Sequence, residues 1–396
     1  ACAWAAVGSS KARRNQSRTV GVKAESGTDP RVLVTFDTSG RLNVTMKRLA
    51  IACLAAAALL APAAAHAQDQ VIATVGRPTP VAAFGGRLLW STVDRASGNW
   101  SLVTRAGGVT QAVPVPPRRV AFDADLGPGP DGSTVAVYSR CAQDPTSGGG
   151  FAPTLYNRGR GCDIWLYDFA TGAERRLANA SAPAATEFFP TIWRDTLAFG
   201  RVYDNKPDLP YIYTRPVNGT ATSTRQPGGP RNLCSRNAST GRMSCTPREV
   251  NRPMSLELYG RRLAFAWTYA GSGEGLNTEI RLDTIGAGHA RVASQNGGGL
   301  TQVQLGWPAF EAGQLFWAQT CFGDPGGCPG RFGLRRYRIT TRETTSAPAP
   351  AAMISHDRDA GVHYLLVDSQ PGADCLGDPE VPGGTCQLRA LTPAFG

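Results

Sequence analysis

The chain has 396 residues, of which 42% are hydrophobic and 18% charged, with 46 Gly, 29 Pro and 10 Cys. Its formal net charge is +11, but the charges are interspersed and form no basic runs with interleaved aromatic residues, so we expect no nucleic-acid partner. Frequent Gly and Pro, without a long helical period, argue against a helical protein.

An export signal is predicted near the N-terminal end. Met46-Lys47-Arg48 is a short basic region, Leu49 to Leu60 is apolar, and Ala65-His66-Ala67 is a small-residue cleavage pattern. This apolar run is shorter than the roughly twenty residues that span a bilayer, so we expect cleavage and no membrane span. The protein is then secreted or lies in the periplasm or cell envelope.

The predicted signal peptide, residues 46–67, divides the chain. Residues 1–45 are interpreted as an upstream extension, disordered or not part of the natural product, and residues 68–396 as a single domain. Residues 1–67 contain nine Lys and Arg and three Asp and Glu, which leaves 32 basic and 27 acidic residues and a net charge of +5 in the domain.

The domain contains eight cysteines in four close sequence pairs. These are Cys141/Cys162, Cys234/Cys245, Cys321/Cys328 and Cys375/Cys386. Structural zinc sites favour Cys-x-x-Cys pairs or added histidines, which this spacing lacks. Because an exported protein meets an oxidising environment, we expect four local disulfides.

A turn followed by an apolar triplet recurs six times. The equivalent first triplet residues are taken as Leu88, Val135, Leu197, Leu263, Leu315 and Val362, at steps of 47, 62, 66, 52 and 47 residues. Four-stranded propeller blades occupy about 40–50 residues. The longer steps coincide with cysteine pairs, so the stapled segments are interpreted as loops on a regular frame.

Each repeat begins with a candidate inner strand. These are Pro80 to Phe84, Val120 to Asp125, Glu187 to Ile192, Met254 to Tyr259, Val303 to Trp307 and Met353 to Asp357. The last repeat lacks a fourth strand, and Val71 to Val75 is a spare one. Pairing it with the strand around Leu388 would close a ring without exposed edges. The prediction is an all-β, six-bladed β-propeller of four-stranded blades, closed by an N-terminal strand.

The second repeat carries a more specific signature. Gly129-Pro130-Asp131-Gly132-Ser133 leads into Thr134-Val135-Ala136-Val137, and Asp163-Ile164-Trp165-Leu166-Tyr167-Asp168 precedes Ala170-Thr171-Gly172. This turn and hairpin resemble the TolB-type propeller repeat, a WD-repeat-like element of bacterial extracytoplasmic proteins. The resemblance implies a six-bladed propeller used chiefly for protein binding.

Polar residues of the inner strands are the candidates for chemistry. The acidic residues of the inner strands are Asp123, Asp125, Glu187 and Glu257. Six inner strands converge on a propeller axis, where such carboxylates could bind Ca²⁺, which prefers oxygen ligands. We take Asp123, Glu187, Glu257 and His356 as the candidate ligands. The alternative is a water-filled channel lined by ordinary polar side chains. His363 is interpreted as a packed or edge histidine, and His289 as solvent-facing.

No catalytic or cofactor-binding motif is recognised, and the sequence lacks the Gly-x-Ser-x-Gly element of serine hydrolases. We therefore predict a monomeric, non-catalytic binding scaffold whose ligand is a protein, peptide or glycan. The alternative is a propeller hydrolase or lyase that depends on a metal in the channel. Propeller folds host many functions, so the fold alone does not identify the ligand.

Overall fold

The computed structural model describes residues 69–144, 160–248, 250–271, 275–296, 301–323, 332–347, 349–369, 375 and 385–392. All of them belong to one unit, His66–Gly396. The predicted upstream extension and signal peptide lie outside the described residues.

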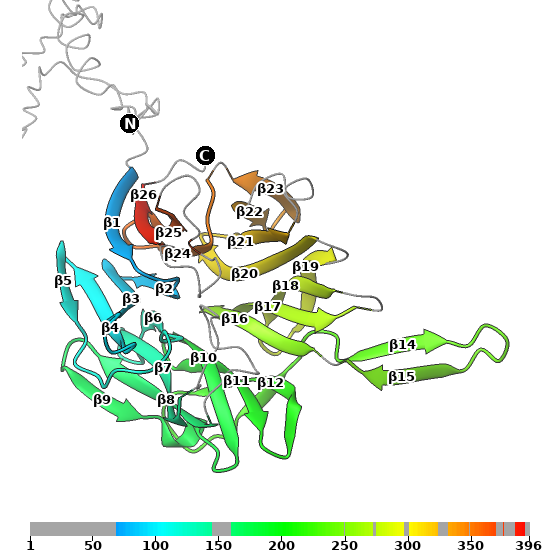
Figure 1. The fold of residues 1–396 in the computed structure, drawn as a ribbon. Coiled ribbons are helices and arrows are strands. Elements are labelled where there is room, and N and C mark those ends of the chain that lie inside the picture. The colour runs from blue at the N-terminus through cyan, green and yellow to red at the C-terminus, as the bar shows by residue number, and fades with distance from the viewer. Residues whose placement is uncertain are drawn as a thin grey trace, which may run out of the picture. The chain divides into compact units, whose positions relative to one another are not determined.

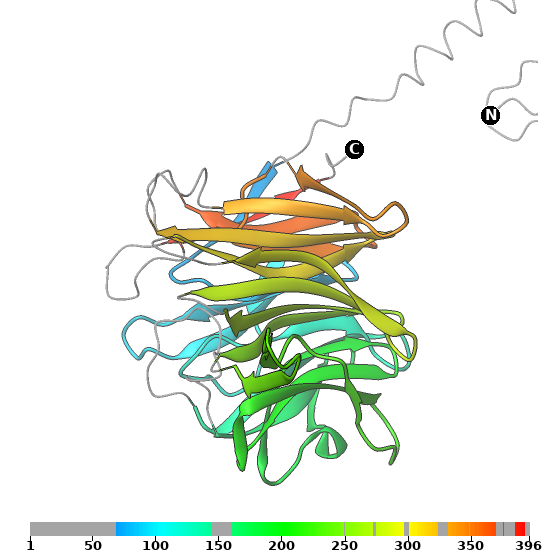
Figure 2. The ribbon, with the colours of Figure 1, turned by 90° about the vertical axis from the view of Figure 1, so that its right-hand side faces the viewer.

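The described strands form six four-stranded antiparallel blades arranged in a ring (Figure 1, Figure 2). From inner to outer strand, blade 1 is β2 (Val81–Phe84), β3 (Arg87–Val93), β4 (Trp100–Ala106) and β5 (Val109–Ala112). Blade 2 is β6 (Asp125–Pro128), β7 (Thr134–Gln143), β8 (Arg160–Asp168) and β9 (Ala173–Arg176). Blade 3 is β10 (Ala185–Trp193), β11 (Thr196–Tyr203), β12 (Lys206–Pro216) and β13 (Thr224–Gln226).

Blade 4 is β16 (Asn251–Tyr259), β17 (Arg262–Ala270), β18 (Leu276–Thr284) and β19 (Gly288–Asn296). Blade 5 is β20 (Thr301–Glu311), β21 (Gln314–Gly323), β22 (Phe332–Arg338) and β23 (Glu343–Ala347). Blade 6 is β24 (Met353–Asp357), β25 (Val362–Asp368), β26 (Cys386–Leu391) and β1 (Asp69–Val75). Between blades 3 and 4, β14 (Asn232–Arg236) and β15 (Met243–Pro247) form a separate hairpin. Within the described residues, no helix is long and apolar enough to cross a membrane.

The two ends of the domain close the ring, as the sequence predicted. Strand β1 pairs antiparallel with β26, and Ala73 lies opposite Leu388. Val75 is 2% exposed and packs in a cluster that joins blade 6 to blade 1. The N-terminal strand therefore removes an exposed sheet edge and also completes an apolar interface.

The core consists of apolar clusters between successive blades rather than one central mass. For example, Ala264 and Ile280 of blade 4 pack with Phe310 and Trp317 of blade 5. The second strand of each blade contributes fully buried residues, such as Ala136, Leu197 and Leu263, because it has a neighbouring strand on either side and a blade on either face. This two-sided burial explains why polar and apolar residues alternate imperfectly in the repeats.

The sixth repeat is aligned differently from the sequence prediction. In blade 4, Leu263 pairs with Leu258, one step inside the pair Arg262/Tyr259 that closes the turn. In blade 6 the closing pair is Val362/Asp357, so His363, which pairs with His356, is the equivalent of Leu263. His363 is fully buried whereas Val362 is only partly buried. The prediction of Val362 as the equivalent of Leu263 is therefore wrong by one residue.

The inner strand of blade 2 also differs from the predicted segment at 120–125, because β6 begins only at Asp125. Before it, the carboxylate of Asp123 accepts a hydrogen bond from the main-chain N–H of Ser139 at 3.0 Å. That donor is thus satisfied by a side chain instead of by a neighbouring strand. At Gly127 a Cβ atom would lie 2.2 Å from the carbonyl oxygen of Ile192, so glycine permits the close approach of blade 3.

Candidate functional site

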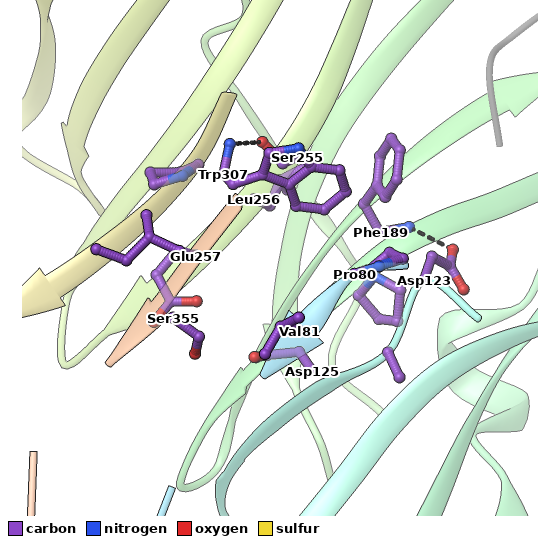
Figure 3. Close-up of a pocket in the computed structure, with 14 residues that line it drawn as sticks. Pro80, Val81, Asp123, Asp125, Phe189, Ser255, Leu256, Glu257, Trp307 and Ser355 are labelled. Atoms are coloured by element: carbon purple, nitrogen blue, oxygen red, sulfur yellow. Dashed lines mark hydrogen bonds between the residues drawn. The ribbon is translucent and has the colours of Figure 1, made fainter. Parts of the chain in front are cut away.

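A small cavity lies on the axis of the ring and receives residues from all six blades (Figure 3). Its lining consists of Pro80, Val81, Asp123, Ala124, Asp125, Phe189, Pro190, Ser255, Leu256, Glu257, Trp307, Pro308, Ile354 and Ser355. The space open to the centres of water molecules is about 40 Å³, which at roughly 10–15 Å³ each holds about three waters. The axis therefore has room for water or an ion, and little room for a larger ligand.

Two aromatic residues that line this cavity, Phe189 and Trp307, have an uncommon backbone conformation. Phe189 has φ 45° and Trp307 has φ 54°, in the left-handed region that non-glycine residues rarely adopt. The Phe189 N–H donates to Asp123 at 2.8 Å, and the Trp307 N–H donates to the Ser255 hydroxyl at 2.9 Å (Figure 3). Their rings meet edge to face, with centroids 6.4 Å apart. Side chains of the neighbouring blades thus fix the main chain at both aromatic residues.

A pair of carboxylates and one arginine provide the charge beside this cavity. Burial raises the pKa of Asp125 to about 6, although hydrogen bonds from Thr191 and the Ile192 main chain oppose that rise. Burial and the nearby Asp125 raise the pKa of Glu257 well above its ordinary value. Arg358 lies 3.6 Å from Glu257. One cation therefore serves two partly buried carboxyl groups, and the raised pKa values favour their protonated forms.

The four residues predicted as channel ligands do not converge on one point. Asp123 lines the cavity, but its carboxylate accepts hydrogen bonds from Ser139 and lies 3.6 Å from Arg118. Glu187 is fully buried in an ion pair with Arg201, at 2.7 Å. These two carboxylates therefore have structural contacts within the ring, Asp123 within blade 2 and with blade 3, and Glu187 within blade 3.

Of the other two predicted ligands, Glu257 lines the cavity, and His356 lies away from it beside His363, in contact with blade 5. Sequence reasoning missed Arg358, Phe189 and Trp307. For the two aromatic residues a signal exists, because each is followed by a proline within an inner strand.

Three of the four predicted disulfides lie within the described residues. Cys141–Cys162 joins β7 to β8, Cys234–Cys245 joins β14 to β15, and Cys375–Cys386 joins Cys375 to the first residue of β26. Cys321 is also disulfide-bonded, and its predicted partner, Cys328, lies outside the described residues. The bridges are local, as the sequence spacing predicted.

A second candidate surface is the β14–β15 hairpin, which projects from the ring (Figure 1). The segment 209–248, which contains the hairpin, has six arginines and no acidic residue or lysine. Arg236 and Arg242 are exposed, and neither forms an ion pair within the described part of the chain. At the tip, Asn237 accepts hydrogen bonds from the Ser239 and Thr240 main chain, at 3.0 and 2.9 Å, which fixes the turn.

A cluster of tyrosines and arginines lies on the neighbouring part of blade 3. The ring centroid of Tyr211 lies 6.4 Å from that of Tyr203 and 6.3 Å from that of Tyr213. The guanidinium of Arg231, at the foot of the hairpin, lies 4.1 Å from the Tyr211 ring centroid, and that of Arg225 lies at 5.0 Å. Tyrosine and arginine are the residue types enriched at binding hot spots. The hairpin and this cluster, together called the basic arm here, thus combine exposed positive charge with aromatic area.

No protein-family model matches the chain, and no curated protein matches it. Among solved structures, it is similar to TolB from Acinetobacter baumannii, with 13% identity, a TM-score of 0.44, and coverage of 79% of this chain and 64% of that chain. It is also similar to Penicillium chrysogenum alpha-L-arabinanase complexed with arabinobiose, with 12% identity, a TM-score of 0.45, and coverage of 82% and 98%. An oligogalacturonate lyase in complex with manganese gives 10% identity, a TM-score of 0.40, and coverage of 84% and 95%.

The chain thus spans less than two thirds of the length of the TolB structure. The strand order and the closure of β1 on β26 identify the architecture independently of these distant similarities. The described chain is a six-bladed β-propeller, the fold that the resemblance of its second repeat to the TolB-type repeat implied.

Proposed function

We propose that this protein is an extracytoplasmic, non-catalytic binding scaffold that engages its partner through the basic arm. The observation that carries the proposal is the projecting, disulfide-linked hairpin within a segment of six arginines and no carboxylates. A rigid, exposed element of one charge sign attracts a partner of the opposite sign and adds little ordering entropy on binding. The partner is a protein, peptide or glycan that carries clustered negative charge.

The axis of the ring favours the same assignment. Its space is limited to about three waters, and the carboxylates of Asp123 and Glu187 are already engaged by protein donors. A second candidate function, a channel hydrolase or lyase, is favoured by the raised pKa values of Asp125 and Glu257, because a carboxyl group with a raised pKa can act as a general acid. Export follows from the predicted signal peptide and is supported by the disulfides.

The charge of the basic arm can be tested with two anionic probes, heparin and poly-L-glutamate. We expect Arg236→Gln/Arg242→Gln to weaken binding of at least one probe by roughly 2- to 30-fold, because each exposed ion pair contributes about 0.2–1 kcal/mol. The matched control is Arg77→Gln/Arg95→Gln, which removes the same charge from exposed positions elsewhere. Equal losses in the two variants would show that only the net charge matters, and would refute the basic arm as the binding surface.

The channel alternative predicts a different pattern. A glycan hydrolase or lyase acting at the axis would lose activity with Glu257→Gln and keep it with the Arg236→Gln/Arg242→Gln variant. If the protein turns over an anionic glycan and this activity depends on Glu257, the scaffold proposal is wrong and the protein is an enzyme.

A further inference from the structure

Two histidines of blade 6 occupy a pair of positions that is apolar or glycine in the other blades. On the second strand, His363 is equivalent to Leu88, Val135, Leu197, Leu263 and Leu315. On the inner strand, His356 is equivalent to Ala83, Gly127, Ile192, Leu258 and Phe310. Core packing is achieved five times without polar atoms at this pair, so packing alone does not account for two imidazoles.

Glu311, the last residue of β20 in blade 5, brings a carboxylate to the same place. Its Oε2 lies 3.1 Å from Nε2 of His363. The rings of His356 and His363 have centroids 4.4 Å apart, and one ligand atom from each of the three residues lies within 4.8 Å of the others. Among the described residues, these three form the one group of three or more potential metal ligands whose ligand atoms lie close together.

The surroundings of the cluster suit a bound ion. His363 is fully buried and His356 is 7% exposed, whereas the Glu311 side chain is 24% exposed and gives access from solvent. Nδ1 of His356 has no hydrogen-bond partner within the described part of the chain, and a buried nitrogen of this kind calls for a partner.

The ligand types select the metal. Two imidazoles and one carboxylate suit zinc and related first-row ions, while Ca²⁺ and Mg²⁺ prefer oxygen ligands. In a tetrahedral site with zinc–ligand distances of 2.0–2.1 Å, the ligand atoms lie about 3.3 Å apart. The contact between His363 and Glu311, at 3.1 Å, already has this spacing, and the ligand atom of His356, within 4.8 Å of the other two, must move closer.

We propose that Glu311, His356 and His363 bind one Zn²⁺ ion between blades 5 and 6, with a fourth position open to water on the glutamate side. The ion links the blade closed by the N-terminal strand to its neighbour. This site is separate from the axial cavity, whose lining includes none of the three residues.

The test is zinc binding by the full chain after treatment with EDTA and dialysis, measured by titration calorimetry. We expect one zinc site per chain that His356→Leu/His363→Leu weakens at least 100-fold. This double variant recreates the Leu258/Leu263 pair of blade 4, so it should fold. Glu311→Gln changes a partly exposed residue and should weaken the site at least 10-fold. His289→Ala removes a histidine from β19 of blade 4 and should leave zinc affinity within 2-fold.

Thermal melts give an independent readout. Zinc at a hundredfold excess over its dissociation constant should raise the melting temperature by about 4 °C in the wild-type chain. It should not raise it in the double variant, and Ca²⁺ should raise it in neither. If zinc fails to bind the wild-type chain, or binds all variants equally, the three residues form a hydrogen-bonded cluster only and the proposal is wrong.

Discussion

Blades 4 and 6 have the same four-stranded architecture but different chain arrangements. Blade 4 is one continuous segment, β16 to β19, whereas blade 6 joins β24–β26 to the N-terminal β1. At the equivalent buried pair, blade 4 has two leucines and blade 6 has two histidines. Blade 6 also contains the buried disulfide Cys375–Cys386. Both blades pack in apolar clusters, but blade 6 depends in addition on the pairing of distant segments and contains a cross-link.

The largest effect is expected from deleting residues 69–75, which tests whether closure by β1 stabilises blade 6. The deletion leaves β26 as an exposed edge and removes Val75 from the cluster between blades 6 and 1. We expect most of the free energy of unfolding to be lost and aggregation to increase, as measured by urea unfolding and light scattering. Replacing residues 232–247 by Gly-Gly is the control, because this exposed hairpin lies outside the blades. Unfolding of the truncated chain at the wild-type urea midpoint would contradict the stabilising role of closure.

The alignment of the two blades is tested by Leu263→Ala and Val362→Ala. Leu263 is fully buried between blades, so its truncation should reduce the free energy of unfolding by about 2–5 kcal/mol in urea titrations. Val362 is only partly buried at the equivalent of Arg262, so the same change there should have an effect of about 1 kcal/mol or less. Equal effects would mean that Val362 is the true equivalent of Leu263.

The frame of the molecule could be predicted because its signals are local. A turn and an apolar triplet recur in each blade, and the spare strand at Val71 to Val75 matches a missing one near Leu388. The one-residue error in blade 6 arose because Val362 is the apolar residue nearest the turn. Burial depends instead on which residue pairs inside the turn, and the sequence pattern does not reveal that His363 has this position.

The candidate site could not be predicted to the same extent, because its residues meet only in the closed ring. Asp125, Glu257 and Arg358 come from blades 2, 4 and 6 and have no sequence proximity. Glu187 is the same residue type as Glu257 in an equivalent inner strand, yet Arg201 on the adjacent strand pairs with it. Glu187 pairs with Arg201 across the strands, whereas Glu257 pairs with Ala264. The residue opposite a carboxylate on the neighbouring strand thus decides whether it is engaged within its own blade.

The two disulfides of blade 6 and of the hairpin are expected to contribute differently to the free energy of unfolding. Cys375→Ser/Cys386→Ser should lower the free energy of unfolding by about 2–3 kcal/mol, because the bridge closes a short loop and both cysteines are buried. Cys234→Ser/Cys245→Ser has the same sequence separation but lies in the exposed hairpin. It should leave the main urea transition unchanged, because the hairpin can open without unfolding a blade. A similar loss of stability in both variants would show that the hairpin is part of the cooperative unit.

The smallest expected effect concerns the charges through which blades 2, 4 and 6 meet at the axis. Burial raises the pKa of Asp125 from 3.8 to about 6 in the folded chain, so between these pH values the folded state binds more protons than the unfolded state. Its contribution to stability is therefore present at low pH and is lost as the pH rises through 6. Asp125→Asn removes this dependence, so its stability relative to wild type should rise by about 1–3 kcal/mol from pH 4 to pH 7 in urea titrations. The control is Asp94→Asn, since hydrogen bonding from Ser97 lowers the pKa of exposed Asp94 and its titration falls below this window. A pH-independent difference between Asp125→Asn and wild type would mean that Asp125 is already ionised at pH 4, and that Arg358 outweighs burial at the axis.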